Sequence, residues 1–472
     1  MSTFSGLSTA LTALTAQRQA LEVAGQNIAN ANTVGYTRQR AELQSVGSGQ
    51  SATMFSQGSP VGNGVQVGSI SRLGDLFLDA RVRTTTSSAS FLAARTDAYK
   101  RLESTIAEPG TNGIARQLDD FWATWQDVAN NPTSAAAGQV VIEGANAVQR
   151  AIATGYTAVA TQWEQTRGKA DALVAEINTA AASVAELNEK IRSITVSGGN
   201  ANELVDQRNV LTTSLASLAG ATVREHPDGT SDVNIGGNPL VSGIKANKLT
   251  VLGGTTMVGA TGADTVRVAW DRVPAGTTAS LTGGQLAGVL TVLAPADGQG
   301  TGGLLAEAAA SYDALATKVA TSVNAIHETV RADGSTGGPV FSIGAGGPPA
   351  LMLTVAITNP SQINAGQGGE DGSIADKIAQ IGTSAGSPDE AWSSFVVATG
   401  VKAKAATQSG LVAETARAAA DNLQLAQTSV DLDEESVNML AFQRSYQGAA
   451  RVMTAIDEML DQLINRTGVV GR

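Results

Sequence analysis

Cysteine is absent from this chain of 472 residues, so neither a disulfide nor a thiolate metal site can form. Histidine occurs only at His226 and His327, which leaves little material for imidazole-based catalysis. Aromatic residues make up only 4% of the sequence, whereas alanine, glycine, serine and threonine dominate. Small side chains suit long, closely packed helices better than a deep ligand pocket. The composition therefore favours a structural protein, and we predict no enzyme activity, cofactor or metal site.

Positive charge is also scarce, and the net charge is −11. A nucleic-acid footprint would be basic and clustered, so we expect no nucleic-acid partner. No apolar run approaches the roughly 20 residues that span a bilayer, so we expect no membrane partner. The first residues show no basic region followed by an apolar block, and a cleavable secretory signal is therefore not predicted. That excludes one export route and leaves the others open.

An amphipathic pattern is present at the N-terminus. Residues 1–34 read as one helix whose other faces carry Ser, Thr, Ala and Gln, with only Arg18 and Glu22 charged. A helix with so little charge needs neighbours on several sides. Its apolar residues follow a heptad spacing and comprise Phe4, Leu7, Leu11, Leu14, Leu21 and Ile28.

A second heptad pattern lies at the C-terminus. Asp431 is the expected N-cap, with Glu434 reaching back from the third helical position, and Gly468 marks the stop. We predict that the two terminal helices pair as a coiled coil that closes the chain on itself. The alternative is two ordinary amphipathic helices docked on separate domains. The C-terminal stripe comprises Met439, Phe442, Tyr446, Ala449, Met453, Ile456, Leu460 and Leu463.

Between these ends the pattern is helical, then β-rich, then helical again, which predicts a mainly α, nested, flagellin-like fold with a β-rich insertion. Segment 61–72 alternates and is rich in glycine, which predicts a short hairpin or a loop, and 75–219 is helical with breaks at 108–113, 130–134 and 197–202. One helix covers about 156–194, β texture fills 221–300, and helices follow at about 304–331 and 389–427. The expected domains are 1–60 with 420–472 (terminal), 61–221 with 385–419 (helical middle) and 222–384 (β-rich outer).

The stretch "NIANANTVGYTRQR" (27–40) connects the first helix to the rest of the chain. Its asparagines bond to local backbone and are poor mid-helix residues. Gly35 is suited to a positive φ that ends the helix. Tyr36, Arg38 and Arg40 then enter an extended segment. We expect a defined turn between a terminal rod and a shoulder, with arginines that reach carboxylates on a neighbour.

This stretch also resembles a known signature. "ANTVGYTRQ" is similar to the "ANTPGYTRQ" of bacterial flagellar axial proteins, with Val34 in place of the usual proline. Further blocks resemble the hook-associated protein 1 family (FlgK type), in matching order over most of the chain. The lead into the acidic cluster is shortened here to "TSVDLDEES". The matching blocks cover 62–83, 202–220, 283–293, 315–330 and 432–465.

The resemblance implies a ring-forming subunit between the flagellar hook and filament, in the extracellular flagellum. Its implied partners are further copies of itself, the hook protein and a second junction protein of the hook-associated protein 3 type. It also implies export through the flagellar type III apparatus, with a chaperone on the C-terminal helix. We expect that chaperone to contact Met439, Phe442, Met453 and Leu460. The expected subunit interface comprises the two apolar stripes (without Ala449) together with Tyr36 and Arg38.

Three rival interpretations stay open at this point. "HETVR" at His327 begins like a zinc-peptidase helix, but Arg331 stands where the second histidine belongs, so a structural role is favoured. Asp206 and Arg208 in "LVDQR" suit an ion pair or a cap better than an acid–base pair. A hook or distal-rod subunit would share the terminal motifs but not the internal blocks. A secreted adhesin with flagellar export ends would need exposed aromatics, at which only Trp270 and Phe341 hint.

Overall fold

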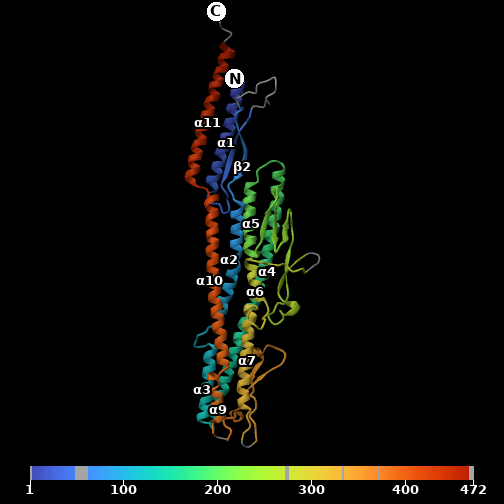
Figure 1. Cartoon of the computed structure of the whole chain (residues 1–472), viewed down its shortest axis with the longest axis vertical. Helices are drawn as coiled ribbons and strands as arrows, with labels where there is room; N and C mark the ends of the chain where they lie inside the picture. Colours follow the sequence, from blue (N-terminus) through green and yellow to red (C-terminus); the bar gives the residue numbers. More distant parts are fainter. Residues whose placement is uncertain (1–2, 48–61, 272–275, 332–333, 369–370, 467–472) are drawn as a thin grey trace, which may run out of the picture.

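The protein is an elongated assembly of long helices with small antiparallel sheets along one side (Figure 1). The computed structural model describes residues 3–47, 62–271, 276–331, 334–368 and 371–466. The predicted mainly α fold with a β-rich insertion is confirmed. Among the described helices, none has the length and hydropathy needed to cross a membrane.

Two helices from opposite ends of the chain lie side by side at one end of the molecule (Figure 1). They are α1 (Thr3–Asn30) and α11 (Leu432–Asp461), the latter extended by a π-helical turn, Gln462–Arg466. α1 ends at Asn30, before Gly35, because the asparagines there form a turn instead of further helix. We call this pair the terminal rod.

The buried face of α1 is not the leucine stripe that the heptad pattern predicted. Leu11 is 57% exposed, and the other described stripe residues of α1, Leu7, Leu14, Leu21 and Ile28, are only half-buried. The side chain of Phe4 lies outside the described residues. Alanine lets a neighbouring element approach α1 more closely than leucine does. The alanine face of α1 therefore makes the contact, and the leucines lie at its edges. The buried apolar residues of α1 are Ala10, Ala16, Ala20, Val23 and Ala24.

The rest of the helical body is built around one very long helix, α4, which runs 62 residues from Ala135 to Val196. The breaks predicted at 108–113, 130–134 and 197–202 are observed, but the helix begins about 20 residues earlier than the sequence suggested. The other long helices of the body are α2 (Leu76–Ile106), α3 (Ile114–Asn130), α5 (Asn202–Ala219), α7 (Leu304–His327) and α10 (Pro388–Thr428).

α2 and α10 pack antiparallel along the body. Asp79 near the start of α2 bonds Gln424 near the end of α10, and Thr96 bonds the carbonyl of Ala406. α10 is continuous through 419–420, where the sequence had placed a domain boundary. The helix break lies instead at Ser429–Asp431, where Asp431 caps α11 as predicted by accepting from two backbone amides.

In the part of the chain that the structure describes, the β-rich region forms three small antiparallel sheets, and a fourth sheet, β1–β2, lies on α1. β2 is a single strand where the sequence suggested a short hairpin or loop within 61–72, and its antiparallel partner is β1. The strands are β1 (Gln39–Ser45), β2 (Val65–Arg72), β3 (Thr222–Glu225), β4 (Ser231–Ile235), β5 (Asn238–Ser242), β6 (Lys245–Ala246), β7 (Leu249–Leu252), β8 (Arg267–Trp270), β9 (Phe341–Ile343) and β10 (Leu353–Val355).

One segment with strand-like composition is a helix. α6 (Gly284–Leu293) is rich in Val and Leu, and the sequence placed it within the β texture. Gly288 explains the outcome, because a Cβ there would lie 2.6 Å from the carbonyl oxygen of Phe91 on α2. Close helix–helix packing thus overrides local propensity. Short helices complete the fold: α8 (Pro349–Met352), α9 (Ser373–Ala379), and 3-10 turns Gly262–Asp264, Pro360–Gln362 and Ile381–Thr383.

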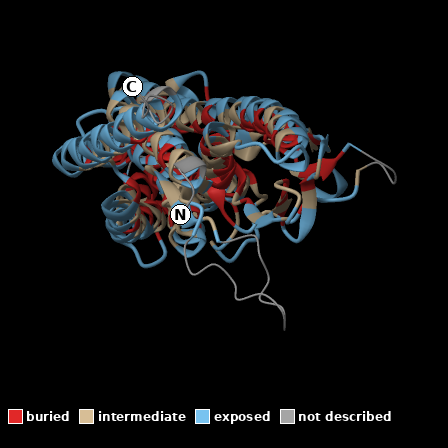
Figure 2. Ribbon diagram, turned by 90° about the horizontal axis from the view of Figure 1, so that it is seen from above, coloured by how far each residue is buried: buried red, intermediate tan, exposed pale blue. Residues whose placement is uncertain are grey.

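The core runs between the helices as a continuous apolar interior (Figure 2). Trp270 and Phe341, the two aromatics that hinted at an adhesive outer surface, are 2% and 1% exposed. They are therefore core residues. Phe121 contacts Trp125 and Phe341 at ring-centroid distances of 6.3 and 5.8 Å, so the aromatic residues of the far end pack on one another.

His327 belongs to this core and has the structural role that the sequence favoured. It is fully buried, its Nδ1 lies 2.6 Å from the carbonyl oxygen of Gly338, and its Nε2 accepts from the amide of Asn364 at 2.8 Å. Nδ1 therefore donates, and the ring is neutral. Burial lowers the pKa of His327; the Gly338 hydrogen bond opposes this shift, and the charge of Arg331 adds to it.

A pH dependence of stability follows from that lowered pKa. The unfolded chain takes up the proton first as pH falls, so His327 stabilises the fold above its unfolded pKa and loses this contribution below it. We expect the free energy of unfolding to fall between about pH 7 and 5. His327→Gln should flatten this fall. Equal pH profiles for His327→Gln and the unaltered chain in urea unfolding would contradict the assignment.

Candidate assembly surface and the polar joint at its base

Arg38 holds the terminal rod to the body at the point where α10 ends and α11 begins. Its backbone N–H donates to the carbonyl of Thr428 at 2.9 Å, which caps the last turn of α10. Its guanidinium donates to Glu435 at 2.7 Å and to Glu434 at 2.8 Å, both in the first turn of α11. The sequence predicted that arginines of this stretch reach carboxylates on a neighbour, and the carboxylates that Arg38 contacts belong to the same chain. Arg40 instead pairs with Glu42 on its own strand.

Burial is unequal within this ion pair. The side chains of Arg38 and Glu435 are 19% and 4% exposed, whereas that of Glu434 is 61% exposed. Burial works against the charge of Arg38, but the hydrogen bonds that it donates to Glu434 and Glu435 outweigh this effect and raise its pKa. A buried carboxylate with one strong partner depends on that partner. Arg38–Glu435 is therefore the principal ionic link between the turn and α11.

Asn27 of α1 connects the turn and the start of β1 to α11. Its amide N–H groups donate to the carbonyl of Gln39 at 2.8 Å and to Glu435 at 3.2 Å. Its oxygen accepts from the Tyr36 hydroxyl at 2.8 Å and from the Gln39 amide at 2.9 Å. This 1% exposed side chain thus makes four hydrogen bonds. Burial and the carboxylates of Asp206, Glu203 and Glu435 raise the pKa of Tyr36 to about 12, so it stays a donor.

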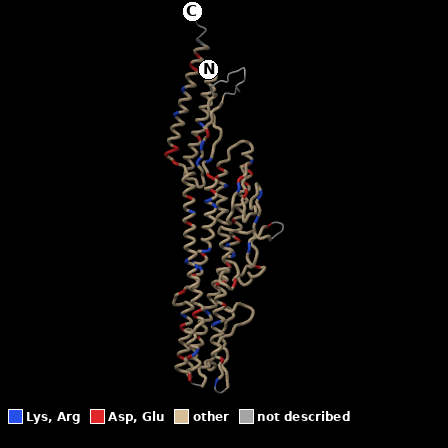
Figure 3. Tube along the Cα trace, in the orientation of Figure 1, with Lys and Arg blue, Asp and Glu red and all other residues tan. Residues whose placement is uncertain are grey.

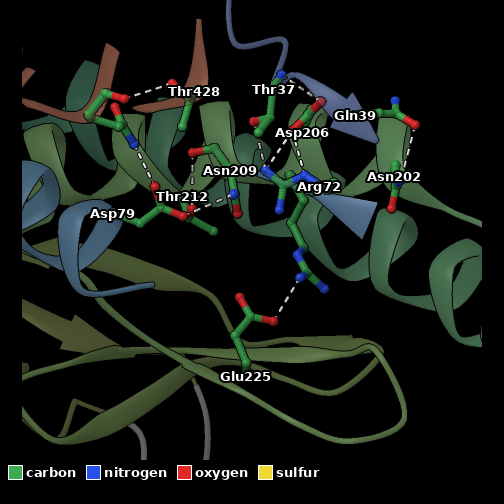
Figure 4. A network of polar contacts seen from close by, with 12 residues as sticks. Thr37, Gln39, Arg72, Asp79, Asn202, Asp206, Asn209, Thr212, Glu225 and Thr428 are labelled. Carbon is green, nitrogen blue, oxygen red and sulfur yellow. Dashed lines mark hydrogen bonds and ion pairs between the residues drawn. The ribbon is translucent and has the colours of Figure 1, made fainter. Parts of the chain in front are cut away.

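A second set of contacts fixes the turn to the body (Figure 4). Asp206 on α5 accepts from the Thr37 amide at 3.0 Å and pairs with Arg72 at 2.6 Å. Arg72 also donates to the Thr37 hydroxyl at 3.0 Å. Asp206 therefore binds both the turn and the end of β2. We call the contacts around Asn27, Thr37, Arg38, Arg72 and Asp206 the polar joint.

Asp206 and Arg208 each form an ion pair, but not with one another. Arg208 donates to Glu225 at 2.7 Å and to Asn188 at 3.0 Å. It is 2% exposed, and burial lowers its pKa although Glu225 opposes the shift. Each residue thus forms an ion pair, which is the kind of structural role that the sequence favoured. Local sequence could not identify either partner.

Gly35 supplies the backbone conformation that the turn requires. Its φ is +80°, and a Cβ there would overlap Cγ2 of Val210 on α5. We expect Gly35→Ala to destabilise the joint by about 1–3 kcal/mol, measured by urea unfolding. Gly25→Ala is the matched control: nothing lies within 4 Å of its Cβ position, and it should stabilise α1 by about 0.5–1 kcal/mol. Equal effects of the two substitutions would refute the argument.

The second functional feature is an apolar surface on the terminal rod and on α10. α11 buries only Glu435 and Ile456, and Gly6 of α1 lets Ile456 approach to 3.0 Å of its Cβ position. The acidic residues of α11 lie near its two ends, with Asp433, Glu434 and Glu435 beside the polar joint, and only Arg444 and Arg451 are charged between them (Figure 3). More than half of the exposed large hydrophobic residues in the described part of the chain lie on α10, α11 and the following turn. A surface of this kind marks an interaction site.

The predicted interface residues divide by their burial. Ile456 is buried in the rod, Phe442, Met453 and Leu460 are half-buried, and Tyr36 and Arg38 belong to the polar joint. Three stripe residues of α11 remain exposed: Met439 at 37%, Tyr446 at 38% and Leu463 at 53%. Asn27, Thr37 and Arg72 were not predicted as joint residues, because no local pattern sets them apart.

Comparison with known families decides the identity. The family model described as "Flagellar hook-associated protein FlgK helical domain" matches residues 99–341, slightly more than half of the chain. The chain belongs to the FlgK family. Two further models match its ends: the C-terminal model of the flagellar basal body rod proteins at 425–466 and the basal body rod model at 7–37. The resemblance inferred from the motifs is thereby confirmed, and the FlgK chain is a structural protein of the flagellum.

Individual relatives carry names from the same FlgK family. Flagellar hook-associated protein 1 of Bacillus subtilis is 28% identical over the full length of both chains. The Escherichia coli protein of the same name is 30% identical over 52% of this chain and 44% of its own length. The solved flagellar hook junction protein FlgK of Burkholderia pseudomallei is 25% identical, with a TM-score of 0.48 over 56% of this chain and 47% of that one.

Proposed function

We propose that this chain forms a ring at the junction between the flagellar hook and the filament. Each copy contacts its neighbours through the terminal rod and the outer face of α10. The hook protein binds one end of the ring, and a second junction protein of the hook-associated protein 3 type binds the other. The subunit leaves the cell through the flagellar type III apparatus, after a chaperone has held α11 in the cytosol.

The observation that carries this proposal is the incomplete burial of α11. A lone α1 covers only one side of it and leaves Val437, Leu440 and Val452 at 52–66% exposure. Removing apolar surface from water contributes about 25 cal/mol per Å² of favourable free energy. Contact with neighbouring copies, which would cover these side chains, therefore favours assembly. The predicted coiled-coil pairing of the ends and the nesting of domains are part of this proposal.

Deletion of the gene tests the proposal. We expect cells without this chain to keep their hooks, lose their filaments and release flagellin into the medium. Supplying the chain from a plasmid should restore filaments. Loss of the hooks themselves would point to a rod or hook subunit, and unchanged filaments would overturn the proposal.

A further inference from the structure

A single phenylalanine projects from the start of α2 at the level of the polar joint. Phe77 is 87% exposed, and Leu76 beside it is 62% exposed. Asp75 caps the helix by accepting from the Phe77 amide at 2.7 Å, so the backbone that carries the ring is fixed. Asp79 contacts α10 and α5, and Phe77 lies roughly 200° around the helix from it. The ring therefore points away from both neighbouring helices.

A hollow of about 450 Å³ lies beside the turn of the same joint. Its walls are mainly apolar, and Asp206, which also lines it, is occupied by Arg72 and the Thr37 amide. In the described structure no side chain fills this space. The apolar walls come from the turn, α4 and α5 and comprise Val34, Leu187, Val210 and Leu211.

The projecting ring and the hollow lie at the same height on the molecule. Asp79, two residues after Phe77, receives a hydrogen bond from Asn209, which directly precedes Val210. The amide of Leu73 likewise donates to the carbonyl of Arg38, just after the turn. We call Phe77 the knob and the hollow the hole. A contact between the knob of one copy and the hole of the next is heterologous, and such contacts close into a ring when the copies are related by rotation.

Charges beside the two features are complementary. Arg81 is exposed one turn after Phe77 and forms no ion pair with any described residue. Glu203 is exposed at the edge of the hollow and is likewise without an ion pair in the described chain. An Arg81–Glu203 pair between copies would fix the register of docking.

We propose that Phe77 of one copy inserts into the hollow beside Val210 of the next copy, with Arg81 facing Glu203. This contact is the specific lateral joint of the ring and rests on the ring function proposed above. An aromatic anchor in a preformed apolar pocket is the usual form of an interface hot spot. The exposed apolar residues of α10 and α11 then add buried interface area, while the contact between Phe77 and the hollow determines the specificity of the interface.

Cross-linking between copies tests the contact without removing the knob. Because the chain has no cysteine, Arg81→Cys with Glu203→Cys introduces the only thiols. In isolated hooks carrying the assembled ring, a short bifunctional maleimide should link the copies into multimers. The control pairs Arg81→Cys with Glu176→Cys, which lies on α4 about 16 Å below Leu187 and should give no multimers. Assembled rings in which Arg81→Cys and Glu203→Cys stay unlinked would overturn the contact.

Substitution of the knob gives a second measurement. Phe77→Asp should reduce the fraction of hooks that carry filaments about tenfold or more. Monomer stability should not change, because the phenyl ring of Phe77 is exposed in the monomer. Arg81→Glu should weaken assembly, and Glu203→Arg should restore it. Full filament growth with Phe77→Asp overturns this inference alone, whereas failure of the unaltered chain to restore filaments in the deletion strain overturns the proposed function.

Discussion

Arg38→Ala is expected to release α11 from the body and to lower the free energy of its opening by about 3–5 kcal/mol. The substitution leaves the Glu435 carboxylate, 4% exposed, with only the 3.2 Å hydrogen bond from Asn27. It also removes the ionic link to the first turn of α11. The exposed Glu434 contributes little to the expected loss. Native-state amide exchange of residues 432–461 measures the opening of α11 directly.

Arg40→Ala is the matched control for this experiment. Arg40 lies two residues later, on β1, and pairs with Glu42 at 2.8 Å, but the two side chains are 64% and 37% exposed. An exposed pair of this kind is worth less than about 1 kcal/mol. Protection of α11 should therefore be unchanged. If Arg38→Ala left α11 as protected as Arg40→Ala does, the ion pair would not be the link between rod and body.

Many limits of the body helices could be predicted because they are marked locally, although α4 begins about 20 residues before its predicted start. Ser387 accepts from the amide of Glu390, and Pro388 occupies the first helical position, so the start of α10 is visible in the sequence. The stops at 108–113 and 197–202 contain glycine or proline for the same reason. The prediction for α6 was wrong because its identity depends on contact with α2, which no local pattern shows.

The terminal rod shows a different limit. Heptad spacing identifies an apolar stripe but does not say whether the stripe faces the same chain or another copy. In α1 the intrachain contact uses alanines such as Ala16 and Ala20, each 1% exposed, and leaves Leu11 outside. Alanines recur throughout the sequence, so this face carried no distinct signal. The leucine stripe remains a prediction for the contact between subunits.

The polar joint was predictable only in part. A basic side chain next to an extended segment suggested a carboxylate partner for Arg38 but did not identify it. The pairing of Arg72 with Asp206 joins residues separated by 134 positions. Such a contact depends on how α5 lies against the turn, which is a property of the whole fold. Asn27 had been interpreted as a helix-ending residue, whereas its side chain links three elements.

Phe442→Asp combined with Leu460→Asp is expected to abolish chaperone capture and ring formation together. Both residues lie half-buried on α11, in the stripe that we propose first binds the chaperone and later the assembled ring. Each side chain contributes about 1.5–3 kcal/mol on full burial, and a carboxylate in its place adds a desolvation cost. Chaperone affinity should therefore fall by at least about 100-fold. Isothermal titration with the chaperone, and the fraction of hooks with filaments, measure the two effects.

A matched double variant separates this surface from general damage to α11. Leu440→Asp with Val452→Asp places the same two charges on the same helix, at residues that are both 52% exposed and outside the stripe. Chaperone binding should survive in this control, because the anchors of a helix-in-groove complex lie on one face. Lost filaments with retained chaperone capture in the Phe442/Leu460 variant would show that export and assembly use different faces of α11. Equal loss of capture in both double variants would assign the effect to helix solubility rather than to the stripe.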